Sequence, residues 1–271
     1  MKLNVYFKFI VAAMMLLSVS ARAAIIDFTI DVSADIYDPV GMTWDGQYLW
    51  VVDDENDFEA HQINPWTGEI LTTFAVNPGN LDEPDTEGIT WDGSHLWVME
   101  SSGILGKYTT TGELVDTLSL GRSELDGITW HEGFFWYTNK TNGKVFQIDE
   151  YGEGVRGFET NLTEIDSIDI YNDSIWVGDD GSDKIYQYDI DTFELLDVID
   201  LDPLLEQAGF DITYNDPKGL TWDDSGNLWF SDDGDEVLVR INYNAIAVSE
   251  PSTIALFSAL FALVMFRRKR S

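Results

Sequence analysis

The sequence predicts an all-β protein: a single β-propeller of about five four-stranded blades, closed by the N-terminal strand, which completes the last blade. One sequence pattern occurs five times at separations of 39 to 52 residues, as expected of propeller blades. Four strand-like runs fit into each of the first four repeats, with turn residues between them. The fifth repeat lacks its fourth strand and an extra strand precedes the first repeat, so joining these two ends would close a ring.

The repeated pattern is a Gly-Ile-Thr-Trp run followed, after a turn, by a Leu-Trp-Val run that ends at an acid or an amide. Its five occurrences begin at Gly41, Gly88, Gly127, Ser167 and Gly219. We interpret the two runs as the inner strands a and b of a blade. Nine of the ten tryptophans fall at two positions of the pattern, which predicts that they pack one blade on the next; Trp66 lies outside it.

Each repeat continues with two outer strands, c and d, in which apolar and polar residues alternate as in half-buried strands. Residues 184–188 and 195–199 are an example, with a turn between them. The fifth repeat ends after a strand c at 237–241, and residues 25–32 have the pattern of a strand d with no blade before it. Pairing these two segments would remove the exposed edges of an open array.

The N-terminal segment, residues 1–23, has the three parts of a signal peptide. Lys2 and Lys8 flank the start of an apolar run over residues 9–17, and Ala21-Arg22-Ala23 is a cleavage site of the A-x-A type. We therefore expect signal peptidase to release a mature chain that begins at Ala24. An uncleaved membrane anchor is the alternative, but the apolar run is too short to span a bilayer.

The C-terminal segment, residues 248–271, combines the motif Glu250-Pro251-Ser252-Thr253 with an apolar stretch and a basic cluster at 267–270. It resembles the PEP-CTERM sorting signal of Gram-negative bacteria, in which the motif is Val-Pro-Glu-Pro; here Ser249 replaces the first proline. The resemblance implies a transient membrane anchor, recognition by an exosortase-type transpeptidase, and display at the cell surface or release outside it. Cleavage of the tail and its retention as an anchor both stay open.

The repeats resemble those of the NHL/YncE-like and gluconolactonase-like superfamily of propellers, whose blades read Gly-Leu-x-x-Asp-x-x-Gly-x-Leu-Trp-Val-x-Asp. Residues 87–98 are a close match, and the resemblance spans residues 25 to 245 within the expected domain, 24–247. It implies the fold but no single activity, because the superfamily holds lactonases, cyclotransferases and binding scaffolds.

The expected domain is strongly acidic. Between Ala24 and Ala247, eight basic residues stand against 48 acidic ones, a net charge near −40. Such a surface repels phosphate backbones, which excludes a nucleic-acid partner, and it attracts cations. A surface that only keeps the protein soluble is the alternative. The chain has no cysteine, which excludes a disulfide framework and a thiolate metal site.

Two rings of side chains are expected at one mouth of the central channel, because strand a starts and strand b ends at the same face of a blade. The first ring, before each strand a, is Val40, Glu87, Asp126, Asp166 and Lys218. The second ring, at the end of each strand b, is Asp53, Glu100, Asn139, Asp179 and Asp232. Converging oxygen ligands suit Ca²⁺. We predict Glu87, Asp126, Asp166, Asn139, Glu100 and Asp179 as metal ligands, with Lys218, Asp53 and Asp232 as further ligand-binding residues.

Each ring has an alternative. Second-ring side chains can instead tie strand b to a neighbouring loop by accepting backbone N–H bonds, and the first ring can be a solvated rim in which Lys218 pairs with an acid. Residues 202–209 have the signals of a short helix, expected over the channel mouth as a lid or a plug.

The function that we predict is that of a surface-displayed, non-enzymatic binding or extracellular-matrix protein loaded with Ca²⁺, with extracellular polysaccharide or surface proteins as partners. The alternative is a divalent-metal hydrolase of the lactonase type, in which the acidic mouth polarises a carbonyl and activates water. No nucleophile elbow, zinc-protease or phosphate-loop motif occurs in the sequence.

Overall fold

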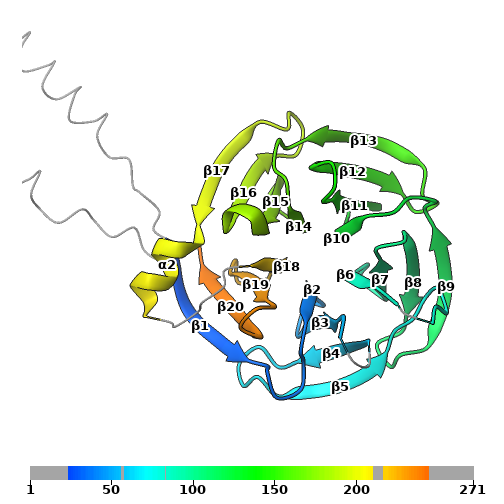
Figure 1. Ribbon diagram of the computed structural model, residues 1–271, viewed down its shortest axis with the longest axis horizontal. Coiled ribbons are helices and arrows are strands. Elements are labelled where there is room, and N and C mark those ends of the chain that lie inside the picture. The colour runs from blue at the N-terminus through cyan, green and yellow to red at the C-terminus, as the bar shows by residue number, and fades with distance from the viewer. Residues whose placement is uncertain (1–23, 56–57, 83, 210–215, 244–271) are drawn as a thin grey trace, which may run out of the picture. The chain divides into compact units, whose positions relative to one another are not determined.

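A computed structural model describes residues 24–55, 58–82, 84–209 and 216–243, and it confirms the predicted fold. Five four-stranded antiparallel sheets stand around a common axis as the blades of a propeller (Figure 1). The predicted signal peptide and sorting tail lie outside the described residues. Among the described residues, no helix is long and apolar enough to cross a membrane.

The strands follow the predicted order from the axis outward in every blade. Blade one holds β2 (Pro39–Trp44), β3 (Leu49–Asp53), β4 (Glu59–Ile63) and β5 (Ile70–Ala75); blade two holds β6 (Thr86–Trp91), β7 (Leu96–Glu100), β8 (Ile104–Tyr108) and β9 (Leu114–Ser119). Blade three holds β10 (Leu125–His131), β11 (Phe134–Asn139), β12 (Lys144–Asp149) and β13 (Gly154–Glu159); blade four holds β14 (Ile165–Tyr171), β15 (Ser174–Asp179), β16 (Lys184–Asp189) and β17 (Leu195–Asp200). Blade five holds β18 (Pro217–Trp222), β19 (Leu228–Asp232), β20 (Val237–Asn242) and the N-terminal strand β1 (Ile25–Asp31).

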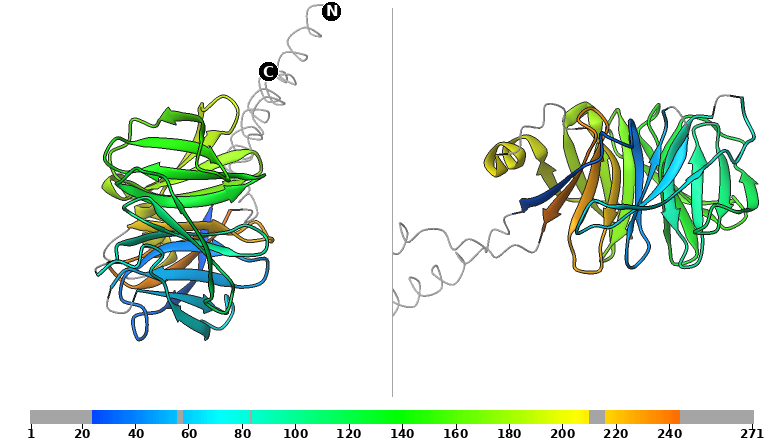
Figure 2. Two further views of the ribbon diagram at one scale, coloured as in Figure 1. Left: turned by 90° about the vertical axis from the view of Figure 1, so that its right-hand side faces the viewer. Right: turned by 90° about the horizontal axis from the view of Figure 1, so that it is seen from below.

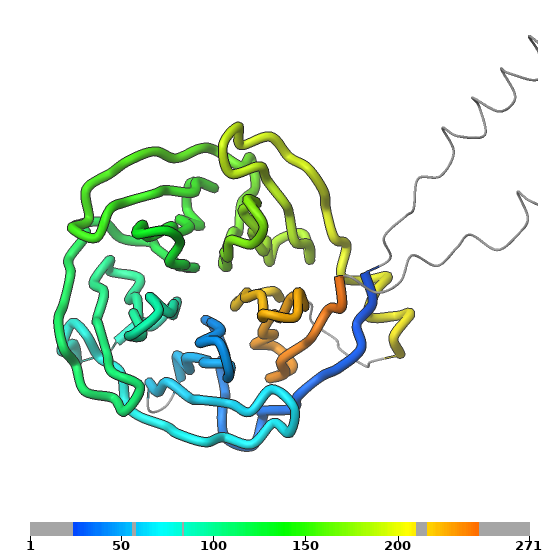
Figure 3. Tube along the Cα trace, turned by 180° about the vertical axis from the view of Figure 1, so that it is seen from behind, coloured from blue at the N-terminus to red at the C-terminus, as the bar shows by residue number. Residues whose placement is uncertain are grey.

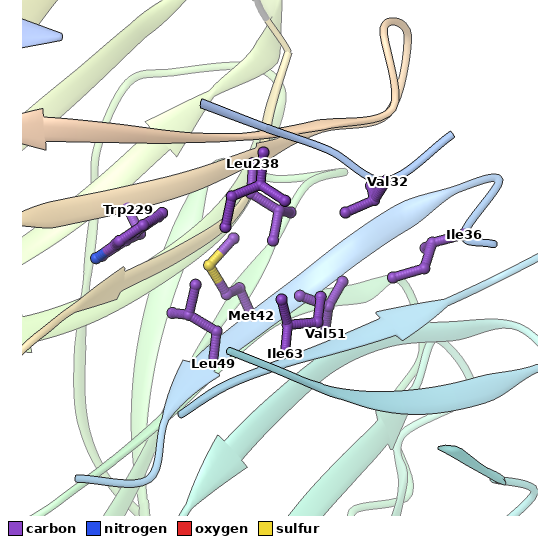
Figure 4. Close-up of a cluster of buried hydrophobic side chains, with 9 residues drawn as sticks. Val32, Ile36, Met42, Leu49, Val51, Ile63, Trp229 and Leu238 are labelled. Carbon is purple, nitrogen blue, oxygen red and sulfur yellow. The ribbon is translucent and has the colours of Figure 1, made fainter. Parts of the chain in front are cut away.

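Strand β1 closes the ring, as predicted. It pairs antiparallel with β20, with Ile30 opposite Leu238, and Figure 3 shows it running along the outside of blade five. The buried side chains of Ile30, Leu238 and Trp229 pack with Met42 and others of blade one in a single core cluster (Figure 4). The first and last strands therefore share both a hydrogen-bond ladder and a hydrophobic core. The outer edge of β20 is covered by β1 and is not left open.

The strand-b tryptophans lie between blades, as their repetition predicts. Trp50, for example, is fully buried and packs with Leu96 and Val98 of blade two. Its indole N–H donates a hydrogen bond of 2.8 Å to Asp45 in the a–b turn. Trp66, outside the repeat pattern, is 61% exposed.

Four of the five blades have a glycine near the start of strand a, because the blades approach closely at the axis. A Cβ on Gly88 would lie 2.7 Å from the carbonyl oxygen of Asp126 in the next blade. Blade four has the larger Ser167 at this position, but its cross-strand partner on strand b is the small Gly178. In blade two, by contrast, Gly88 pairs with the larger Met99. The resulting axial cavity has a volume of only about 10 Å³, room for one water or ion and not for an organic molecule.

Threonines of strand a link neighbouring blades farther along the axis. The hydroxyl of Thr90 accepts a 2.8 Å hydrogen bond from the backbone N–H of Trp130. In blade four the equivalent residue is Asp169, whose carboxylate accepts 2.8 Å hydrogen bonds from the hydroxyl of Thr129 and the N–H of Trp222. Burial raises the pKa of Asp169, and these donors oppose that shift.

The predicted short helix exists, but its expected place over the channel mouth is wrong. Helix α2 (Leu201–Ala208) ends at Gly209, which has φ of 75°, and it lies beside β1 at the outer edge of the ring (Figures 1 and 2). It starts directly after β17, the outermost strand of blade four, and it buries Leu201 and Leu205. Its position is therefore set by the strand that it continues, and α2 is neither lid nor plug.

Candidate functional site

The second-ring residue of blade one, Asp53, is a loop anchor. Its carboxylate accepts backbone N–H bonds from Tyr37 and Asp38, both at 3.1 Å, and from Glu55 at 2.9 Å. The first two donors precede β2 and the third follows β3. Asp53 thus joins the end of strand b to the loops on both sides of it.

The other second-ring residues make similar bonds. Glu100 accepts the N–H of Asp85 at 2.9 Å, Asp179 that of Glu164 at 3.2 Å, and Asp232 that of Asp235 at 2.8 Å; the amide of Asn139 donates to the carbonyl of Ser123 at 3.0 Å. All five second-ring side chains are buried. The second-ring side chains thus tie strand b to neighbouring loops, which was the alternative to metal binding for this ring. Some of these carboxylates, such as those of Glu100 and Asp232, still keep one oxygen without a partner among the described residues.

A lysine that the sequence analysis did not single out contacts the first ring. Lys140 Nζ lies 2.9 Å from Asp126 Oδ1 and 3.7 Å from Glu87 Oε1, so it bridges two of the predicted metal ligands. A sequence signal for it existed. The residue after each second-ring position is Asp54, Ser101, Lys140, Asp180 and Asp233, and only blade three has a cation there.

Lys218, a member of the first ring, bridges the predicted ligand Asp166 to Asp180. Its Nζ lies 2.8 Å from Asp166 Oδ2 and 2.8 Å from Asp180 Oδ2. The structure thus brings Glu87 and Asp126 together on Lys140, and Asp166 and Asp180 together on Lys218. Nearby carboxylates raise the pKa of both lysines although burial lowers it, so both ammonium groups stay charged.

Burial makes the first-ring carboxylates weak acids. Desolvation and the neighbouring Asp126 raise the pKa of Glu87 to about 9, although Lys140 opposes the shift. Desolvation also raises the pKa of Asp126 to about 6, and it raises that of Asp166. At neutral pH, Glu87 therefore holds a proton while Asp126 pairs with Lys140.

Several buried carboxylate oxygens at this mouth have no hydrogen-bond partner within the described part of the chain. Two belong to the first ring, two to the second ring and two to neighbouring aspartates. In that order they are Asp126 Oδ2, Asp166 Oδ1, Glu100 Oε1, Asp232 Oδ2, Asp38 Oδ1 and Asp233 Oδ1. Such oxygens are rare in folded proteins unless they meet a proton, a water or an ion. The mouth has the capacity to accept a cation.

Three carboxylates gather closely enough to bind one ion. Oxygen atoms of Asp180, Asp183 and Asp216 lie within 4.8 Å of one another, and all three residues are half-buried. Two oxygens bound to the same Ca²⁺ are at most about 5 Å apart, since each lies 2.3–2.6 Å from the ion. The donor set therefore fits Ca²⁺. Of the described His, Asp and Glu residues, only this trio meets that spacing.

Local structure positions the trio. Asp180 begins the 3₁₀ turn η1 (Asp180–Ser182), Asp183 follows it with φ of 56°, and Asp216 precedes β18. Burial and a hydrogen bond with Asp180 raise the pKa of Asp216 to about 8. Burial opposes a lowered pKa at Asp180, but hydrogen bonds from Asp216 and Lys218 hold it below its usual range. The two carboxyls therefore share one proton, in the place where a metal ion would bind.

Comparisons with known proteins reach the fold and no further. The structure is similar to that of glutaminyl cyclase from Myxococcus xanthus, with a TM-score of 0.68 and 13% identity over 81% of this chain and 95% of that chain. It is also similar to a chain of a nidogen/laminin complex (TM-score 0.51, 15% identity, 72% of each chain) and to a chain of the mitotic checkpoint complex (0.50, 11%, 79% of this chain and 93% of that one). No family model and no curated protein matches this sequence. The superfamily and PEP-CTERM resemblances stay predictions.

Proposed function

We propose that this protein is an exported, surface-displayed, non-enzymatic binding protein that takes up Ca²⁺ at the acidic mouth of its propeller. The observation that carries the proposal is the Asp180, Asp183 and Asp216 trio, whose oxygens lie within 4.8 Å of one another. The trio joins the end of blade four's strand b to the start of blade five. A bound ion would therefore fix the loops of these two blades and shape that face for a partner.

The trio is a better candidate than the first ring for one physical reason. Glu87 keeps its proton at neutral pH, and Lys140 and Lys218 already neutralise part of the charge on Asp126 and Asp166. A divalent cation there would meet an ammonium group beside each ligand. In the trio, Lys218 contacts Asp180 alone, and no described Lys or Arg lies within 4.0 Å of Asp183 or Asp216, so the Asp180–Asp216 pair mainly has to release the proton that it shares.

The proposal is tested by calorimetric titration of the purified protein with CaCl₂ and by thermal melts in calcium or chelator. Because Ca²⁺ would bind only the folded state, melting temperature should rise with concentration as RT ln(1 + [L]/Kd). Binding should also release protons near pH 7 and tighten as pH rises toward 8, since Asp216 must ionise.

Variants locate the site. Asp183→Asn should abolish the calcium response, while Asp191→Asn, an exposed aspartate of the same blade, should keep it. The Asp126→Asn/Asp166→Asn double variant should also keep it. Loss of the response in that double variant alone would place the ion in the first ring. An equal rise with NaCl at matched ionic strength would mean that calcium only screens the net charge near −40.

An enzyme is the second candidate, and one observation favours it. Glu87 is a protonated carboxyl beside Lys140, a pairing that can donate a proton to a leaving group or a carbonyl oxygen. The glutaminyl cyclase of similar fold and the lactonases of the resembling superfamily suggest the substrates to try: peptides with an N-terminal glutamine, and small lactones. Turnover that is lost in Glu87→Gln would support this candidate over the binding protein.

A further inference from the structure

Two arginines stand out on this acidic domain because no described carboxylate pairs with them. Of the eight basic residues between Ala24 and Ala247, six have a carboxylate oxygen within 4.0 Å. The other two are Arg122 and Arg156, and no described Asp or Glu lies that close to either. Each guanidinium instead donates a hydrogen bond to a neutral group, Tyr137 Oη for Arg122 and Gln147 Oε1 for Arg156, so its positive charge stays available to a carboxylate of another molecule.

Both arginines line the same groove, on the outer edge of blade three. The groove has a volume of about 530 Å³ and is lined by Arg122, which follows β9, and by residues of β12 and β13. These two strands are the outer strands of blade three (Figure 1). Lys144 lines it as well, paired at 2.7 Å with the exposed Glu159. Arg122 lies on the face of the sheet toward blade two, with Phe146, and Arg156 lies on the face toward blade four, with Trp136. Three of the domain's eight basic residues thus line this one edge of the sheet.

Two glycines of β13 open the groove. A side chain on Gly157 would lie 2.6 Å from the backbone of Val145 and 3.2 Å from the ring of Phe146. A Cβ on Gly154 would have more room, because its nearest neighbouring atom would be Arg122 Nη2 at 3.7 Å. The missing side chains leave the backbone of β13 accessible beside the arginines.

The guanidinium groups are held in place by aromatic rings. That of Arg122 lies 5.7 Å from the centre of the Phe146 ring. That of Arg156 lies 5.0 Å from the centre of the Trp136 ring, and its Nε donates a 2.7 Å hydrogen bond to Gln147. Each fixed, planar guanidinium still has N–H groups to offer a carboxylate. Because the guanidiniums cover these rings, the rings are not free to stack on sugars.

Strand β13 is also an edge strand. Its only partner among the described strands is β12, so its outer N–H and C=O groups face away from the sheet. An extended peptide can pair with such an edge and add a strand to it. We propose that this groove binds an extended acidic segment of a partner protein, which pairs with β13 and places carboxylates on Arg122 and Arg156. The site is separate from the channel mouth and does not depend on Ca²⁺.

The test uses a fluorescein-labelled peptide of Glu-Glu-Val-Val repeats, which places carboxylates on both faces of an added strand, measured by fluorescence anisotropy in chelator. We expect binding that weakens with salt, and a loss of roughly tenfold or more in Arg122→Gln/Arg156→Gln, since the double substitution removes both charged hydrogen-bond donors from the groove. Arg240→Gln is the matched control. Arg240 also lies over aromatic rings, but it is paired at 2.8 Å with Asp27.

The proposal is overturned by equal binding of the double variant, by tight binding of the matching Lys-Lys-Val-Val peptide, or by preference for polygalacturonate over the peptide, which would indicate an acidic polysaccharide. If the double variant does not fold, the single Arg122→Gln and Arg156→Gln variants should each lose part of the affinity. Methylating alternate backbone nitrogens of the peptide should abolish binding, and full binding by the methylated peptide would exclude strand addition.

Discussion

Replacing Glu87 by Gln should stabilise the protein at neutral pH, and the gain should grow with pH. Glutamine closely mimics a protonated Glu87 and does not titrate. In the wild type, Glu87 keeps its proton up to about pH 9, whereas the unfolded chain releases it near pH 4.5. Between these values the folded state binds more protons, so the free energy of unfolding falls as pH rises.

The size of the effect follows from the two pKa values. Each pH unit in this window costs at most about 1.4 kcal/mol, so the wild type loses up to roughly 3 kcal/mol between pH 4.5 and pH 7 through this group. Its side chain is 15% exposed, so solvent screening reduces this ceiling only in part. For a domain of this size, about 2–4 °C of melting temperature per kcal/mol gives a gain of roughly 6–12 °C at pH 7.

The assay is thermal denaturation followed by circular dichroism, in chelator, at several values between pH 5 and pH 8. The informative quantity is the difference in melting temperature between Glu87→Gln and wild type, since other carboxylates titrate equally in both. The matched control is Glu113→Gln, an exposed residue, for which the difference should stay near zero. If the difference in melting temperature between Glu87→Gln and wild type does not change with pH, the conclusion that Glu87 is protonated in the folded state is refuted.

Further predictions concern packing, closure and processing. Gly88→Ala should lower the melting temperature strongly, because the added Cβ would lie 2.7 Å from the next blade, whereas Gly154→Ala has its nearest neighbour at 3.7 Å and should be nearly neutral. Ile30→Ala removes a buried side chain of β1 and should cost about 2–5 kcal/mol in urea unfolding; no loss would mean that β1 does not close the ring. Mass spectrometry of protein from its native host should show a start at Ala24 and an end near Glu250; recovery of full-length chain at the cell surface would contradict the sorting prediction.

The fold was predictable from the sequence because its signals are local and repeated. Alternation of apolar and polar residues marks each half-buried strand, and the tryptophan positions recur once per blade. Closure was predictable as well, since the unpaired strand at residues 25–32 and the missing strand after 237–241 complement each other. The membership of the two rings at the channel mouth was predictable from the repeat as well, because equivalent positions of the repeated blades lie at the same end of the axis.

What each side chain contacts was decided only by the tertiary structure. Lys140 reaches Glu87 from the next repeat, and Asp216 meets Asp180 across a blade boundary; both depend on distances between blades, which the sequence period does not encode. The position of α2 depended on where β17 ends. The groove at Arg122 and Arg156 arises from a loop of one blade lying against the outer strand of the next. The repeat thus determined which elements form, while the contacts between blades determined which charges are paired, protonated or free to bind.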